Sequence, residues 1–177
     1  MIVKPKVAVV VGTAGCVFDD IKQLESLLPN REDYSVFTVN FATMLPLKPN
    51  YICAIHGDYI DTYKAIACIK AEEYGWRKDF YTISTFGNAD HIFDDLGVSG
   101  TSGRFTASVA LEMGYHKVIL VGVPLSGSKR FYGDIRHDYS KCLPVMEWQE
   151  MDKMKVKSFS GNTLELLGEP TQEWLDA

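Results

Sequence analysis

The sequence lacks several features that would assign a protein to a broad class. No apolar run approaches the roughly 20 residues that a membrane-spanning helix needs. The opening residues, Met1 to Lys6, do not have the pattern of a secretory signal peptide. The formal net charge is −5, so there is no general electrostatic reason to bind nucleic acid or an anionic membrane. We therefore expect a cytoplasmic protein with no membrane span and no nucleic-acid partner.

Paired cysteines and metal-ligand spacings are also lacking. The four cysteines are far apart and form no CxxC pair: Cys16, Cys53, Cys68 and Cys142. This usage is typical of free, mostly buried thiols in a reducing compartment. His91, Asp94 and Asp95 lie near one another, but their spacing matches no metal site. The sequence thus predicts no metal site and no cofactor apart from the ligand itself.

No internal repeat, low-complexity tract or linker divides the chain, which alternates strand and helix patterns from end to end. Its 177 residues, 46% of them apolar, fit one domain over residues 1–177. We expect an open, mostly parallel α/β sheet with helices on both faces. The expected strands cover residues 7–11, 34–40, 51–55, 80–84, 118–123 and 156–159. The expected helices cover residues 19–28, 61–76, 143–154 and 171–174, together with one that ends at Gly114.

The region from Ser99 to Gly127 is the most informative. A polar, glycine-rich loop with Thr101, Ser102 and Gly103 precedes a helix, and a continuous apolar run typical of a central strand follows. The free N–H groups and positive dipole at such a helix N-terminus bind phosphate or another anion. The same loop is also compatible with a tight turn that only feeds a core helix.

The first strand runs directly into the turn Gly12-Thr13-Ala14-Gly15, and a helix follows it. A strand, a glycine turn and a helix form the usual phosphate-approach unit of an open α/β sheet. The dinucleotide fingerprint is absent, because Phe18 stands where its third glycine would be, and no GK[ST] sequence indicates a P-loop. A nucleotide-binding turn and a purely structural compact turn both remain open.

Polar residues also end the next two strands. Asn40 ends the second and can donate and accept hydrogen bonds at the edge of a nucleobase, although it could also cap a turn. His56 and Asp58 follow the third. Because parallel strands end at the same edge of a sheet, we expect these side chains and the first turn to surround one crevice, which we interpret as a nucleotide site.

The segment from residue 124 to about residue 140, which we call the lid segment, has no regular periodicity and follows the central strand. Its polar and cationic side chains are those of Lys129, Arg130, Tyr132, Arg136, His137 and Tyr139. In an acidic protein this group favours an anionic ligand, and a histidine with an ordinary pKa can take up a proton at neutral pH. The segment is also compatible with a solvated loop.

Five stretches together resemble a known family: VAVVVGTAGCVFDDIKQL, VFTVNFA, YICAIHGD, TSGRFTASVALEMGYHKVILVGV and VKSFSGNTL. They are similar to the Rossmann-like group that includes bacterial sialyltransferases that use CMP-sialic acid, and related uncharacterised proteins from phages and surface-polysaccharide loci. The resemblance covers most of the chain and is closest around Thr101 to Gly103. It implies a single-domain Rossmann-like fold that binds a nucleotide or nucleotide sugar.

The resemblance also implies roles for individual residues. In that family a histidine after the central strand is the general base for the acceptor hydroxyl, and tyrosines hold the leaving phosphate. His137 matches the base, and Tyr132 and Tyr139 match the phosphate ligands. Three functions stay open: a metal-independent glycosyltransferase, a non-catalytic nucleotide-sequestering protein of the same fold, and another α/β enzyme such as a nucleotide hydrolase. For the second, the resemblance implies a phage-encoded protein. The oligomeric state also stays open.

Overall fold

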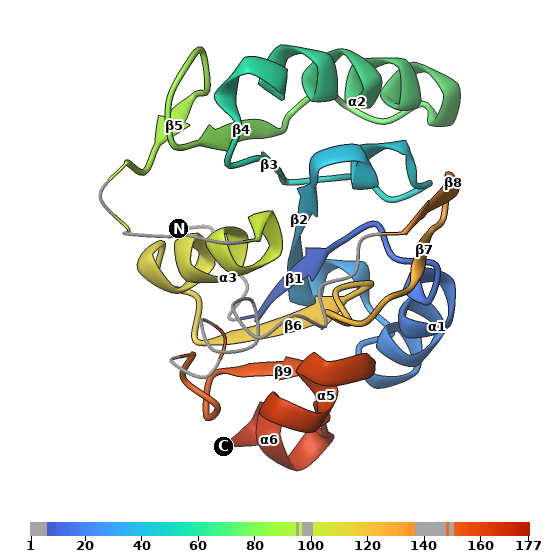
Figure 1. Ribbon diagram of the computed structural model, residues 1–177, viewed down its shortest axis with the longest axis vertical. Coiled ribbons are helices and arrows are strands. Elements are labelled where there is room, and N and C mark those ends of the chain that lie inside the picture. The colour runs from blue at the N-terminus through green and yellow to red at the C-terminus, as the bar shows by residue number, and fades with distance from the viewer. Residues whose placement is uncertain (1–6, 95, 97–100, 137–147, 149–150) are drawn as a thin grey trace.

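The computed structural model describes residues 7–94, 96, 101–136, 148 and 151–177 (Figure 1). Its main sheet contains β1 (Val7–Val11), β2 (Tyr34–Val39), β3 (Tyr51–Cys53), β4 (Tyr81–Ser84), β5 (His91–Ile92), β6 (Lys117–Val121) and β9 (Val156–Ser158). These strands follow the order β5-β4-β3-β2-β1-β6-β9, and every neighbouring pair is parallel. The expected open, parallel sheet is confirmed.

Helices cover both faces of this sheet. They are α1 (Val17–Leu27), α2 (Ile60–Tyr74), α3 (Ser102–Glu112), α5 (Gly161–Leu167) and α6 (Gln172–Asp176), with 3-10 turns η1 (Arg31–Asp33), η2 (Asn40–Met44) and η3 (Gly57–Tyr59). Ala8 and Val10 of β1 pack in one hydrophobic cluster with α3, whereas Val9 and Val11 pack in another with α1. This alternation follows from the two-residue period of a strand. The fold is Rossmann-like.

The strands β1 and β6 lie side by side in the interior of the sheet, and their apolar runs are buried. Figure 1 shows α2 and β5 at one end of the molecule, and β9, α5 and α6 at the other. Along the chain, the strands β2 to β5 follow one another on one side of β1, and β6 and β9 then lie on its other side.

Three parts of the structure differ from the sequence-based expectation. The segment 85–98, where no strand was expected, contributes the short edge strand β5. The lid segment, expected to be irregular, forms an antiparallel hairpin of β7 (Lys129–Arg130) and β8 (Gly133–Arg136). The helix α5 begins at Gly161, where no helix was expected. All three elements are short, and short elements have too few residues to show a period.

The expected helix 143–154 lies mostly outside the described residues; Trp148 is helical, but residues 151 and 152 are not, and residues 153–155 form a turn. Cys16, Cys53 and Cys68 are free thiols, and Cys142 lies outside the described part of the chain. Across the residues that the structure describes, no helix is both long enough and apolar enough to cross a membrane.

Candidate functional site

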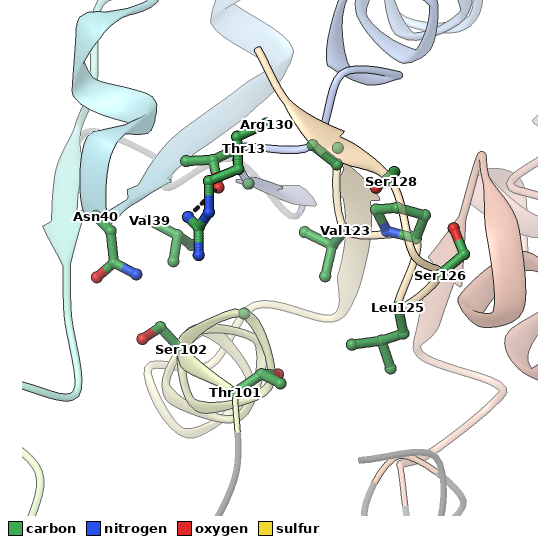
Figure 2. A pocket seen from close by; sticks show the side chains of 15 residues that line it. Thr13, Val39, Asn40, Thr101, Ser102, Val123, Leu125, Ser126, Ser128 and Arg130 are labelled. Atoms are coloured by element: carbon green, nitrogen blue, oxygen red, sulfur yellow. Dashed lines mark hydrogen bonds between the residues drawn. The ribbon is translucent and has the colours of Figure 1, made fainter. Parts of the chain in front are cut away.

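A cavity opens at the carboxyl ends of β1 and β6, where the strand order reverses. Open α/β sheets bind their ligands at such a switch point. We call it the switch-point cavity. The described residues that line it are Gly12, Thr13, Ala14, Val39, Asn40, Thr101, Ser102, Gly103, Gly122, Val123, Pro124, Leu125, Ser126, Ser128 and Arg130 (Figure 2). Its volume of about 110 Å³ is below the 300 Å³ or more of typical ligand pockets, so a ligand of nucleotide size would extend beyond these residues.

The first wall is the turn after β1. The Gly12 N–H donates to Val121 O (2.8 Å) and the Ala14 N–H to Gly122 O (3.2 Å), so the turn continues the pairing of β1 with β6. A Cβ at Gly12 would lie 2.7 Å from Val123 Cγ2. The glycine is therefore required by the close approach of the two strand ends.

Asn40 forms the second wall. It directly follows β2 and has a φ of 52°, in the left-handed region that asparagine tolerates better than most residues. Its carbonyl accepts a hydrogen bond from Thr43 Oγ1 (3.2 Å), which holds η2 in place. Figure 2 shows the Asn40 amide at the edge of the cavity, on the same side as Val39 and Ser102.

The N-terminus of α3 forms the third wall. Thr101 is the N-cap, and its Oγ1 accepts a hydrogen bond from the Arg104 N–H (3.3 Å). Figure 2 shows the Ser102 side chain pointing toward the same space as Asn40 and Arg130. A Cβ at Gly103 would lie 2.9 Å from Val123 Cγ1, so this glycine lets α3 pack against the end of β6. The wall offers hydroxyls and the positive end of the helix dipole.

The fourth wall, residues 122–128, depends on α5. Asn162 Nδ2 donates to Leu125 O (2.7 Å), and Thr163 Oγ1 donates to Val123 O (2.6 Å). Leu125 has a φ of 47°, which is unusual for a bulky residue and indicates local strain. The two side chains from α5 stabilise this wall. The sequence analysis missed both residues; the signal that it overlooked was the polar Gly161-Asn162-Thr163 run directly after the last strand.

The hairpin is joined to the first turn. The Gly15 N–H donates to Lys129 O (2.7 Å), the Phe131 N–H donates to Thr13 O (3.0 Å), and Ala14 bridges Arg130. Its aromatic side chains pack on other elements: the Phe131 ring contacts Phe18 of α1, and the Tyr132 ring contacts Phe41 of η2. The hairpin therefore holds a defined position beside the cavity.

Arg130 is the one charged residue among the described residues that line the cavity. Its Nη1 donates to Thr13 Oγ1 and to Tyr132 Oη, each at 2.8 Å. Figure 2 shows its guanidinium pointing into the cavity. Within the described part of the chain no carboxylate forms an ion pair with it. Guanidinium groups bind carboxylates and phosphates through paired N–H donors, so this wall can bind an anion.

A buried carboxylate supports the end of β6 from behind. Asp20 of α1 is 2% exposed, and its Oδ2 accepts hydrogen bonds from the Gly122 N–H (2.7 Å) and from Ser160 Oγ (2.8 Å). Cys16 Sγ lies 3.3 Å from the same Ser160 Oγ. Burial raises the pKa of the Asp20 carboxyl above its ordinary value, and the Gly122 N–H opposes that rise. This role of Asp20 was not predicted from the sequence.

The predicted site residues fall into three groups. Seven of the expected nucleotide-binding residues line the cavity: Gly12, Thr13, Ala14, Asn40, Thr101, Ser102 and Gly103. Gly15, His56 and Asp58 are not among its lining residues. Gly15 contacts the hairpin instead, and His56 and Asp58 are exposed at η3.

Of the expected catalytic residues, Tyr132 contacts Arg130, while His137 and Tyr139 lie outside the described residues. Among the described side chains, no group of three or more His, Cys, Asp or Glu could hold a metal ion.

The sheet and its switch-point cavity define a Rossmann-like α/β fold, and solved structures share this fold. The chain is similar to the sialyltransferase CstII from Campylobacter jejuni in complex with cytidine-5'-monophosphate, described there as a substrate analogue. The TM-score is 0.62 at 13% identity, over 94% of this chain and 86% of that one. CstII in complex with CMP-3FNeuAc gives 0.58 at 13% identity, over 93% and 87%. No family model and no curated protein sequence matches the chain. The resemblance to sialyltransferases therefore lies in the fold.

Proposed function

We propose that the protein binds a nucleotide or nucleotide sugar in the switch-point cavity and is a metal-independent, sialyltransferase-like glycosyltransferase. The observation that carries the proposal is the meeting of the Gly12–Ala14 turn, Asn40 and the N-terminus of α3 around one cavity. The fold shared with CstII, which was solved with CMP ligands, supports the same assignment.

The cavity wall supplies the groups that such a ligand needs. The Asn40 amide can pair with the edge of a base, since it both donates and accepts. Hydroxyls at Thr101 and Ser102 and the dipole of α3 stabilise negative charge on a phosphate. A nucleoside monophosphate is then a good leaving group, because these donors stabilise the charge that develops on its phosphate oxygen.

In the proposed reaction, His137 takes the proton of the acceptor hydroxyl, and the acceptor oxygen bonds to the anomeric carbon of the sugar. The bond from that carbon to the phosphate oxygen breaks, and the nucleoside monophosphate leaves with the electron pair. Tyr139 would bind the leaving phosphate. General-base catalysis of this kind contributes on the order of 10² to 10⁴ in rate.

A second candidate is a protein that binds and sequesters a nucleotide without turnover. One observation favours it: none of the described residues that line the cavity has a side chain that takes up a proton near neutral pH. A general base would then have to come from outside this set of residues, as His137 does. Both candidates predict nucleotide binding, and they differ only in turnover.

Two experiments test these functions in order. First, thermal unfolding is followed with CMP, UMP, UDP, GDP, ADP and their sugar forms. A ligand at 100 times its Kd adds about 2.7 kcal/mol to the free energy of unfolding and raises Tm. No shift with any of them would contradict both candidates. Second, the formation of free nucleoside monophosphate from a nucleotide sugar is measured for the wild type and for His137→Ala. If this reaction stops in the variant while the nucleotide Kd stays the same, transfer is supported. If the wild type binds the nucleotide sugar without cleaving it, the sequestering function remains.

A further inference from the structure

We propose that Arg130 is the residue that makes this site select a phosphate-bearing ligand, and that Thr13 and Tyr132 act on the ligand only by orienting Arg130. The inference rests on the proposed nucleotide function and deepens it. It also changes the role expected for Tyr132, from a direct phosphate ligand to a positioning residue.

The first argument is charge. The cavity wall contains backbone, hydroxyl, amide and apolar groups, and Arg130 carries the only formal charge among its described residues. Because no described carboxylate neutralises it, the full charge of the guanidinium acts on the cavity. In a protein with a net charge of −5, this cation gives the cavity a sign opposite to that of the molecule as a whole.

The second argument is geometry. Nη1 is the guanidinium nitrogen that donates to Thr13 and to Tyr132, and the Arg130 guanidinium also lies 5.7 Å from the centre of the Tyr132 ring. The Nε and Nη2 groups form no hydrogen bond to any residue that the structure describes. The Nε and Nη2 edge has two parallel N–H donors, which match two oxygens of a phosphate.

The third argument is preorganisation. Thr13 belongs to the turn that continues β1, and Tyr132 belongs to the hairpin and packs on Phe41 and Phe131. Arg130 is thus held from two different elements before a ligand arrives. An arginine that is already ordered loses little rotamer entropy on binding, so its charge contributes more to affinity.

The test compares CMP with cytidine, which lacks the phosphate, by titration calorimetry. Arg130→Gln removes the charge, and Arg130→Lys keeps it without the paired donors. The matched control is Arg77→Gln, which makes the same charge change at a side chain that is 87% exposed, next to β4 at the opposite edge of the sheet. Tm without ligand reports whether each variant folds.

We expect Arg130→Gln to raise the Kd for CMP about 10- to 100-fold, the range for a lost charge-assisted hydrogen bond, and to leave the Kd for cytidine unchanged. Arg130→Lys should recover part of the loss, and Arg77→Gln should change neither Kd. An unchanged ratio of the two Kd values in Arg130→Gln would overturn the proposal.

The positioning roles are tested by Thr13→Val and Tyr132→Phe, alone and combined with Arg130→Gln. As a single substitution, each should weaken CMP binding. In the Arg130→Gln background, each should have no further effect, because its effect passes through Arg130. If either substitution weakens CMP binding by the same factor in the Arg130→Gln background as in the wild type, its side chain contacts the ligand directly. If the wild type binds inorganic phosphate through Arg130 but no nucleotide, the proposed function fails and the Arg130 assignment stands. If it binds neither phosphate nor nucleotide, both fail.

Discussion

Asp20 and Gly122 are 102 positions apart in the sequence, yet the Asp20 carboxylate accepts a 2.7 Å hydrogen bond from the Gly122 amide. Gly122 lies directly after β6, lines the cavity and has a φ of 65°. A Cβ on this residue would lie 2.8 Å from Val17, which also belongs to α1. The helix α1 therefore holds in place the start of the fourth wall of the cavity, at Gly122.

Asp20→Ala should lower the free energy of unfolding by about 3 kcal/mol, because it leaves the buried Gly122 N–H without its acceptor and breaks the bond to Ser160. Asp20→Asn should cost much less, since a single amide oxygen can accept both bonds that Oδ2 now accepts. Urea denaturation measures both variants. Equal losses for alanine and asparagine would contradict this role of the carboxylate oxygen.

The raised pKa of Asp20 gives its stability contribution a defined pH dependence. Between the unfolded-state pKa of about 3.9 and the higher folded-state pKa, the native protein binds more protons than the unfolded chain. The contribution of Asp20 to the free energy of unfolding should therefore fall as pH rises through that window and be constant above it. Asp20→Asn should lack this component, so the difference in stability between wild type and variant is the quantity to follow. A difference that rises with pH would contradict the assignment.

Asn40→Gly should separate ligand binding from folding. Glycine keeps the left-handed backbone at this position and removes the amide, so nucleotide affinity should fall about tenfold without a lower Tm. Asn40→Ala should lower Tm as well, because alanine in this conformation costs roughly 1 kcal/mol or more. Asn88→Gly, at an exposed loop position, is the matched control and should change neither property. Unchanged nucleotide affinity in Asn40→Gly would remove Asn40 from the site.

Gly12→Ala should destabilise the protein by about 1–3 kcal/mol even without a ligand, since the added methyl group meets Gly122 O and Val123 at the end of β6. Gly127→Ala, where nothing lies within 4 Å of the added Cβ, should be nearly neutral. Chemical denaturation of both variants without ligand makes the comparison. If Gly12→Ala is neutral for stability and changes only nucleotide affinity, the glycine serves the ligand and not the packing.

Much of the fold could be predicted because its central strands are long apolar runs with turn residues at their ends. The strand β1 and the end of α3 at Gly114, with a φ of 88°, are as expected. In contrast, β5, the hairpin and α5 are short, and their formation depends on neighbours that are distant in the sequence. Local pattern carries little information about such elements.

The candidate site was predictable where a polar residue directly follows a strand or precedes a helix, as with Asn40 and Thr101. The supporting residues were not, because their roles depend on tertiary contacts. Asp20 looks like a residue that favours a helix N-terminus, and Asn162 looks like part of a turn. His56 ends a strand at the correct edge, but β3 lies two strands away from the switch point.

The most direct test of the central claim is to map which backbone amides change their NMR shifts when CMP is added. The account predicts changes at Gly12 to Ala14, at Asn40, at Thr101 to Gly103 and at Arg130, which surround the switch-point cavity. Changes confined to the separate groove lined by Lys22, Ser26 and Glu169 would place the ligand elsewhere. Such a result, or no change with any nucleotide, would contradict the account.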